Sequence, residues 1–135
     1  MSIGGTSLTL KKAQHLEPMH FSPISRDHGW YSVQILSVYL GDILLTNQES
    51  LRGFNDEKGT ILDTGTADIY LPSTITKPFK LAWERLTGDI HGNKIGWYTY
   101  DEFWSMPDLI LTLSGGFHWV IGPENYLEES FPVTK

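Results

Sequence analysis

The sequence has no cysteine, no long apolar run and few basic residues, and each absence excludes a class of protein. Without cysteine, none of the 135 residues can form a disulfide, a thiol nucleophile or a cysteine–zinc site. No apolar stretch approaches the ~20 residues that a membrane-spanning helix needs. Ten Lys and Arg against sixteen Asp and Glu give a net charge of −6 with no basic stripe, so nucleic acid is not an expected partner.

Metal-ligand spacing and a phosphate-binding loop are also missing, so we expect neither a metal nor a cofactor. Gly115-Gly116 lies between two strand-like runs rather than before a helix, which favours a hairpin turn over a phosphate loop. His118 alternates with Trp119 in one of these runs and is expected at the surface. The other histidines are His15, His20, His28 and His91.

Apolar material sufficient for a core is present, with 40% hydrophobic and 13% aromatic residues. Residues 30–40 are rich in β-branched and aromatic side chains that partly alternate with polar ones, which predicts a strand. Gly41-Asp42 interrupts the pattern and residues 43–45 resume it, so a hairpin is expected. A second hairpin is predicted for Leu109–Leu113 and Phe117–Ile121, around Ser114-Gly115-Gly116.

One helix is predicted over residues 73–86, because apolar side chains recur there at helical spacing and Gly88 offers a stop. The chain as a whole is expected to be mainly β with one or two short helices. The remaining expectations are a linker and entry strand over 1–29, a loop or a strand with a turn over 46–59, short strands at 60–62 and 69–71, and a loop with an aromatic cluster over 89–102.

The segment Ile61-Leu62-Asp63-Thr64-Gly65-Thr66 carries the most chemical information. Its two apolar residues place Asp63 at the end of a buried strand, and Gly65 allows a sharp turn that brings backbone N–H groups towards the carboxylate. The hydroxyls of Thr64 and Thr66 can orient that carboxylate. A carboxylate suits acid–base catalysis when a second one nearby shares a proton with it. Asp63 is therefore the candidate catalytic residue, although Asp-Thr-Gly alone is also a common turn sequence.

The longer stretch ILDTGTADIYLP, residues 61–72, resembles the second active-site segment of the pepsin-like aspartic proteases. Several other segments resemble that family's C-terminal lobe in the same order along the chain, and the likeness is greatest to its β-secretase-like and plant-like members. These segments are Phe21–Ile24, Trp30–Val33, Ile35–Leu45, Met106–Leu113 and Ile121–Leu127.

The resemblance implies a role for each residue of the motif. Asp63 would be the catalytic aspartate of the C-terminal lobe, and Thr64 would bond across to the other lobe. Gly65 would be the turn glycine, Thr66 would hydrogen-bond the outer carboxylate oxygen, and Leu71-Pro72 would start the helix behind the site. Two positions depart from the family pattern: Ala67 replaces a usual Ser or Thr, and Asp68 adds a charge close to the site.

By the same resemblance, residues 1–135 form a partial C-terminal lobe of a bilobal aspartic endopeptidase. The N-terminal lobe, with the second catalytic aspartate, and the final strands would lie outside this chain, so that lobe is the expected partner and a peptide or protein the expected substrate. The isolated chain is expected to be inactive, to expose an apolar docking face, and to hold Asp63 with a pKa near the ~3.9 of a free aspartate.

Two other functions remain open from the sequence. In a homodimeric, retroviral-type protease, two copies of Asp63 would form the dyad and Trp119–Gly122 would be the apolar-apolar-Gly element. In a catalytically inactive pepsin-like protein, the chain would serve binding or inhibition. The expected location is the secretory pathway, a vacuole or lysosome, or the cell exterior, with a membrane anchor elsewhere in the full-length protein as one option; Met1–Gly5 carries no signal-peptide pattern, so a signal would lie outside the chain.

Overall fold

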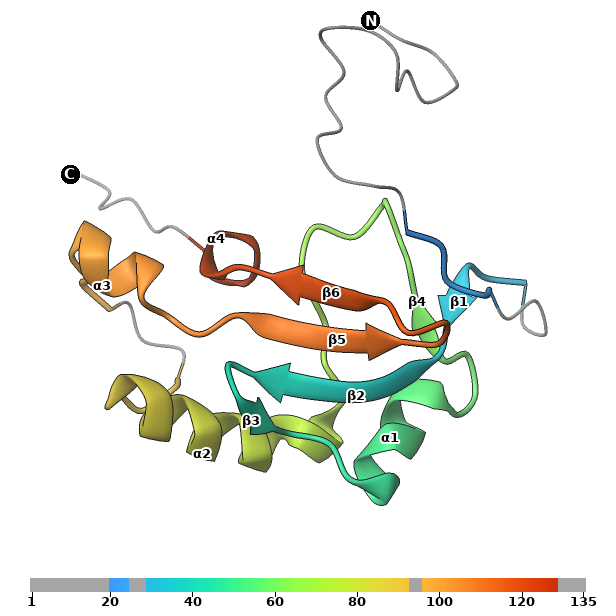
Figure 1. Ribbon diagram of the computed structural model, residues 1–135, viewed down its shortest axis with the longest axis horizontal. Helices are drawn as coiled ribbons and strands as arrows, with labels where there is room; N and C mark the ends of the chain where they lie inside the picture. The colour runs from blue at the N-terminus through green and yellow to red at the C-terminus, as the bar shows by residue number, and fades with distance from the viewer. Residues whose placement is uncertain (1–19, 25–28, 93–95, 129–135) are drawn as a thin grey trace, which may run out of the picture.

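The computed structural model describes residues 20–24, 29–92 and 96–128 as antiparallel sheets combined with short helices (Figure 1). A four-stranded sheet has the strand order β3-β2-β5-β6, and a separate two-stranded sheet pairs β1 with β4. The strands are β1 (Ser32–Val33), β2 (Ile35–Leu40), β3 (Ile43–Leu44), β4 (Thr60–Ile61), β5 (Leu109–Leu113) and β6 (His118–Ile121). The helices are α1 (Gln48–Asn55), the 3₁₀ turn η1 (Ser73–Ile75), α2 (Thr76–Thr87), α3 (Tyr100–Trp104) and α4 (Pro123–Tyr126).

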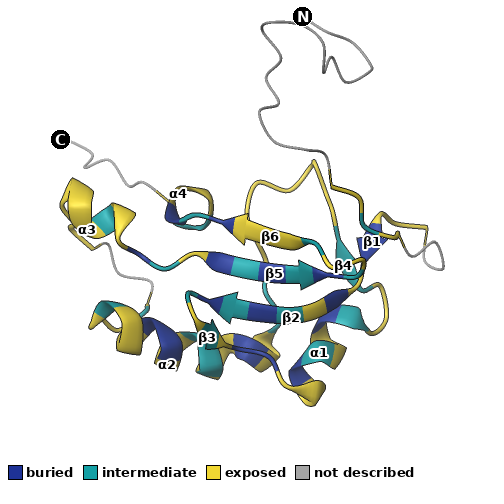
Figure 2. Ribbon diagram, viewed as in Figure 1, coloured by how far each residue is buried: buried dark blue, intermediate teal, exposed yellow. Residues whose placement is uncertain are grey.

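The four-stranded sheet buries one face, as period-two alternation requires. In β5 the residues Leu109, Leu111 and Leu113 are buried while those between them are partly exposed. Val38 and Leu40 of β2 have no exposed surface. Helices α1 and α2 contact β2, and the buried positions of Figure 2 gather between these helices and the sheet. The core therefore lies on one side of the sheet.

Both predicted hairpins are confirmed. Strands β2 and β3 pair around the turn at Gly41, which has a φ of 56°, and β5 and β6 pair around Gly115 and Gly116, with φ of 93° and 82°. These left-handed conformations are those that glycine adopts without a steric penalty. The predicted helix over 73–86 is also confirmed as η1 followed by α2, which ends at Gly88 with a φ of 77°.

The expectation of one or two short helices is wrong, because the described residues contain four α-helices. Residues 46–59, expected as a loop or strand, contain α1, which begins at a capping box between Asn47 and Ser50. Residues 89–102, expected as a loop, include the start of α3, where Thr99 and Glu102 form a second capping box. Each box satisfies N–H groups that a helix start leaves free, which stabilises these short helices.

Two further expectations need correction or lie outside the described residues. The run Ile69–Leu71 forms no strand in the described part of the chain, although its side chains are typical of one. Of the linker and entry strand expected over 1–29, residues 1–19 and 25–28 fall outside the description, and the others contain no strand. None of the helices in the described ranges has the length and apolar character that a bilayer crossing requires.

A bulge in β2 separates the two sheets. The pairing of β2 with β5 shifts register between Ile35 and Ser37. The Asn55 side chain, at the end of α1, binds both backbone groups of Ile35: Oδ1 accepts from the Ile35 N–H at 2.8 Å, and Nδ2 donates to the Ile35 C=O at 2.8 Å. The Asn55 side chain thus makes the hydrogen bonds to Ile35 that a neighbouring strand would otherwise make. The residues before Ile35 pair with β4 instead.

Candidate active site

Asp63 lies just beyond β4, at the start of an exposed loop. Strand β4 is held against β1 in the register Ser32 with Ile61, and the Leu62 N–H extends the pairing by donating to the Tyr31 C=O at 2.9 Å. Thr60 ties the strand to α1, since its hydroxyl donates to the Phe54 C=O at 3.0 Å. The backbone is therefore fixed up to the residue that precedes Asp63.

Both oxygens of the Asp63 carboxylate accept hydrogen bonds from its own loop. The Gly65 N–H donates to Oδ1 at 2.8 Å, and the Thr66 hydroxyl donates to Oδ2 at 2.7 Å. These are the contacts that the motif predicts for Gly65 and Thr66. Two donors on different oxygens fix the orientation of the carboxylate plane, although the side chain is exposed.

Glycine at position 65 is explained by close approach rather than by a left-handed backbone. A Cβ on Gly65 would lie 3.2 Å from Asp63 Oδ1, tighter than ordinary van der Waals contact, and its φ is not in the positive range. A side chain there would push the carboxylate away from the Gly65 N–H. The turn inferred from the sequence is present at Thr64 and Gly65, and the glycine also leaves room for this contact.

The expected pKa of Asp63, near that of a free aspartate, is corrected by the structure. The hydrogen bond from the Thr66 hydroxyl is the largest cause that lowers the pKa of Asp63, followed by the bond from the Gly65 N–H, while slight desolvation opposes them. Donors that bind a carboxylate favour its charged form. Asp63 therefore stays ionised further into the acid range than a free aspartate does, and acts as an oriented acceptor.

The rest of the motif contributes less to this geometry. Thr64 and Ala67 are exposed, and the Tyr70 hydroxyl lies 3.5 Å from Asp68 Oδ2, at the limit of hydrogen bonding. Asp63 was expected between two short strands, but only the strand before it is present among the described residues. Apolar side chains flank the loop and remain exposed: Leu62 by 41%, Ile69 by 43% and Tyr70 by 78%.

The other residues that the sequence singled out do not lie near Asp63 in a catalytic arrangement. His118 is exposed on β6, as expected, with Nδ1 3.0 Å from the Thr112 hydroxyl. In the aromatic cluster around α3, Trp97 and Tyr100 are exposed by 78% and 77%, whereas Phe103 is partly buried against the core. No group of three metal-ligating side chains occurs within the described ranges. The sequence analysis did not predict a pocket beside α2, which is lined by residues from distant segments of the chain and includes His91.

Comparisons with known proteins identify no relative. No family model matches the chain, and neither the curated proteins nor the solved structures contain a significant match. Arguments about function therefore rest on the residues and their geometry.

Proposed function

We propose that this chain is part of the C-terminal lobe of a pepsin-like aspartic endopeptidase and supplies Asp63 as one of two catalytic carboxylates. The observation that carries the proposal is the pair of hydrogen bonds from Gly65 and Thr66 to the two oxygens of Asp63. The bond from the Gly65 N–H is that of an ordinary Asx turn, whereas the Thr66 hydroxyl adds a second donor on the other oxygen. A carboxylate that must hold one orientation towards a reacting water needs both.

The reaction would need a second carboxyl group that is protonated when Asp63 is ionised. Two carboxyl groups in contact share one proton, because both cannot carry charge at short distance. The ionised member takes a proton from a water whose oxygen attacks the peptide carbonyl carbon, and the protonated member donates to the carbonyl oxygen. A proton then passes to the leaving amine as the C–N bond breaks. The lowered pKa of Asp63 suits the ionised role at the start of the cycle.

The second carboxylate would come from an N-terminal lobe that docks at the Asp63 loop. The exposed apolar side chains Leu62 and Tyr70 beside the loop support an interface there, because contact would remove them from water. A homodimer, in which a second copy supplies the other Asp63, is favoured by the same exposure and is the second candidate. Its proposed apolar-apolar-Gly element, Trp119–Gly122, falls on β6 and the residue after it.

Peptidase assays at acidic pH separate these proposals. The full-length protein should cleave a peptide substrate, and Asp63→Asn should abolish cleavage because the amide cannot take the proton. Asp68→Asn is the matched control: it removes an exposed carboxylate five residues away and should leave the activity within about twofold. The 135-residue chain alone should be inactive at every concentration.

Two outcomes would overturn the bilobal proposal. Activity of the chain alone that rises with the square of its concentration would identify the homodimer. A full-length protein that binds a statine-type transition-state mimic but cleaves nothing would identify an inactive binding protein. Because Asp63 is exposed, Asp63→Asn should fold normally, and near-ultraviolet circular dichroism would verify this.

A further inference from the structure

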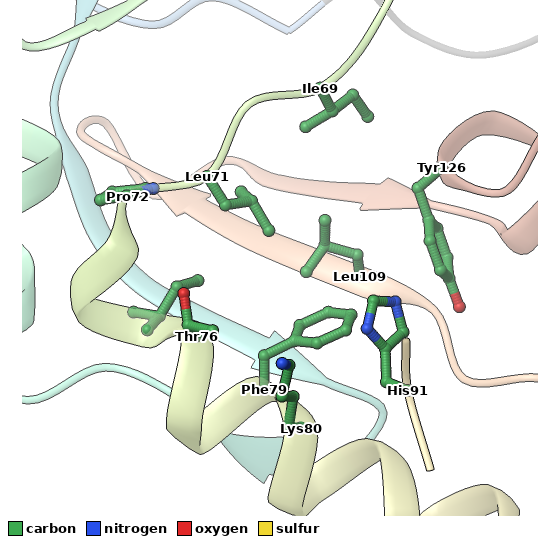
Figure 3. Close-up of a pocket in the computed structure, with 10 residues that line it drawn as sticks. Ile69, Leu71, Pro72, Thr76, Phe79, Lys80, His91, Leu109 and Tyr126 are labelled. Carbon is green, nitrogen blue, oxygen red and sulfur yellow. The ribbon is translucent and has the colours of Figure 1, made fainter. Parts of the chain in front are cut away.

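A mainly apolar pocket with a volume of about 270 Å³ lies beside α2, on the side that faces residues 69–72 (Figure 3). Ile69 and Leu71 line one wall, Phe79 lines another, and Leu109 of β5 lies between them. Ile75, which is only 1% exposed, closes the pocket towards the core. The volume is slightly below the roughly 300–1,000 Å³ of typical small-molecule sites, so an occupant would be small.

Two side chains that can carry positive charge lie across the pocket from Ile69. They are Lys80 of α2 and His91, which follows α2 by a short loop (Figure 3). The His91 ring packs edge-on against Phe79 and Trp83, with centroids 5.0 Å and 5.2 Å apart, so its position is fixed by aromatic contacts.

The other polar side chains of the lining, Thr76 and Tyr126, carry no charge that would compete with Lys80 and His91. The Tyr126 hydroxyl donates to the Pro107 C=O and is therefore already engaged, and burial raises the pKa of Tyr126, which keeps it neutral. No aspartate or glutamate is among the lining residues, in a chain whose net charge is −6. Local cationic character on an acidic protein indicates a site for a negatively charged group.

We infer that this pocket binds a small carboxylate with an apolar body, such as a medium-chain fatty acid. The tail would lie against Ile69, Leu71 and Phe79, and the carboxylate would accept hydrogen bonds from Lys80 Nζ and the His91 ring. The inference is independent of Asp63 and of peptide hydrolysis, and binding involves no covalent step.

Binding should tighten as the pH falls from 8 to 6. Without a ligand, burial lowers the pKa of His91, and the positive charge of Lys80 lowers it further. A carboxylate bound beside the ring would stabilise the imidazolium form, so the complex takes up a proton that the free protein lacks. Tyr126, whose pKa is raised by burial and by the nearby carboxylates of Asp108 and Glu124, stays neutral over this range.

Octanoate is a suitable probe, and octanol, with the same tail and no charge, is its matched control. Isothermal titration should give saturable one-to-one binding of octanoate and at least about tenfold weaker binding of octanol, since a hydrogen bond to a charged group is lost. Lys80→Gln should weaken octanoate binding by about tenfold and leave octanol unchanged. Lys77→Gln removes an exposed lysine of the same helix that does not line the pocket, and it should change neither.

His91 supplies a second readout that does not depend on a substitution. Its pKa, measured by NMR from the imidazole protons, should rise when octanoate is added and stay constant with octanol. Equal affinity for octanoate and octanol, an unchanged affinity in Lys80→Gln, or a His91 pKa that does not respond to octanoate would each overturn the proposal. Absence of saturable octanoate binding at pH 6 would overturn it as well.

Discussion

Replacing Asn55 by alanine should destabilise the whole fold, although the side chain touches neither the pocket nor Asp63. Asn55 donates to one backbone group of Ile35 and accepts from the other, both at 2.8 Å. Ile35 is only 1% exposed and lies at the bulge where β2 begins. Alanine would remove both partners at once and leave a backbone N–H and a C=O without hydrogen bonds.

The expected loss follows from the number of groups left unpaired. A buried backbone group without a partner costs about 1–3 kcal/mol, and the lower half of this range applies here because Asn55 itself is half-buried and water can approach. Two such groups give a loss of about 2–4 kcal/mol in the free energy of unfolding. For a domain of this size that corresponds to a decrease of roughly 10 °C in Tm.

Urea unfolding followed by tryptophan fluorescence would measure this loss. With a typical slope of ~1–3 kcal/mol per M, the midpoint should fall by about 1–2 M at unchanged slope. Asn125→Ala is the matched control: its amide donates only to the exposed Glu124, so the change should stay within ~0.5 kcal/mol. If Asn55→Ala were as stable as this control, the proposed role of the side chain as a substitute strand would be refuted.

Three further predictions concern single residues. Gly88→Ala should lower stability by about 1 kcal/mol in thermal unfolding; no atom lies within 4 Å of the added Cβ, so the cost is that of a φ of 77° alone, and a neutral result would contradict it. Thr66→Val should raise the pKa of Asp63 in an NMR titration, because the hydrogen bond that lowers this pKa most is lost. Since the pKa is lowered in the folded protein, the wild-type bond stabilises the fold at neutral pH and ceases to do so as the pH falls through that pKa. An unchanged pKa would show that the bond is absent in solution. Tyr126→Phe should cost about 1 kcal/mol in chemical unfolding, because the Pro107 carbonyl loses its donor, and no loss would mean that water replaces it.

The hairpins and α2 could be predicted because their signals are local. Alternating side chains and a glycine turn specify β2 with β3 and β5 with β6 within a dozen residues of sequence. Gly88 ends α2 by its own conformational freedom. The same locality applies to the site: the donors to Asp63 are two and three residues away, so the motif alone predicts both bonds.

Helix α1 begins at a local capping box, but it was missed because the rest of its support comes from distant segments. Gly53, in its middle, is typical of a loop, yet a Cβ there would lie 2.8 Å from the Thr74 hydroxyl and 3.2 Å from Pro72 Cβ. The glycine therefore permits close packing of α1 against the start of η1. The side chain of Asn55, the final residue of α1, hydrogen-bonds the backbone of Ile35, twenty positions earlier. Neither partner can be inferred from residues 46–59 alone.

The pocket could not be predicted for the same reason. Its lining joins residues 69–72, α2, His91, Leu109 and Tyr126, which are separated by up to 57 positions. Each of these residues has an ordinary explanation in its own segment, as a helix side chain or a core residue. Only the tertiary arrangement places Lys80 and His91 on one edge of an apolar hollow.

The exposure of Asp63 bears on how a catalytic pair could be assembled here. A carboxylate bound by two donors and open to water is ionised and weakly basic, so by itself it is a poor proton acceptor. Only a nearby second carboxyl group and the exclusion of water can raise its basicity to the level that catalysis needs. Strand β4 and the two hydrogen bonds fix the backbone and the carboxylate of Asp63, but they leave the carboxylate open to water. The proposed function therefore requires the partner lobe to contribute both the second carboxyl group and the cover, and a partner that supplied the cover alone would leave Asp63 a fixed but inactive anion.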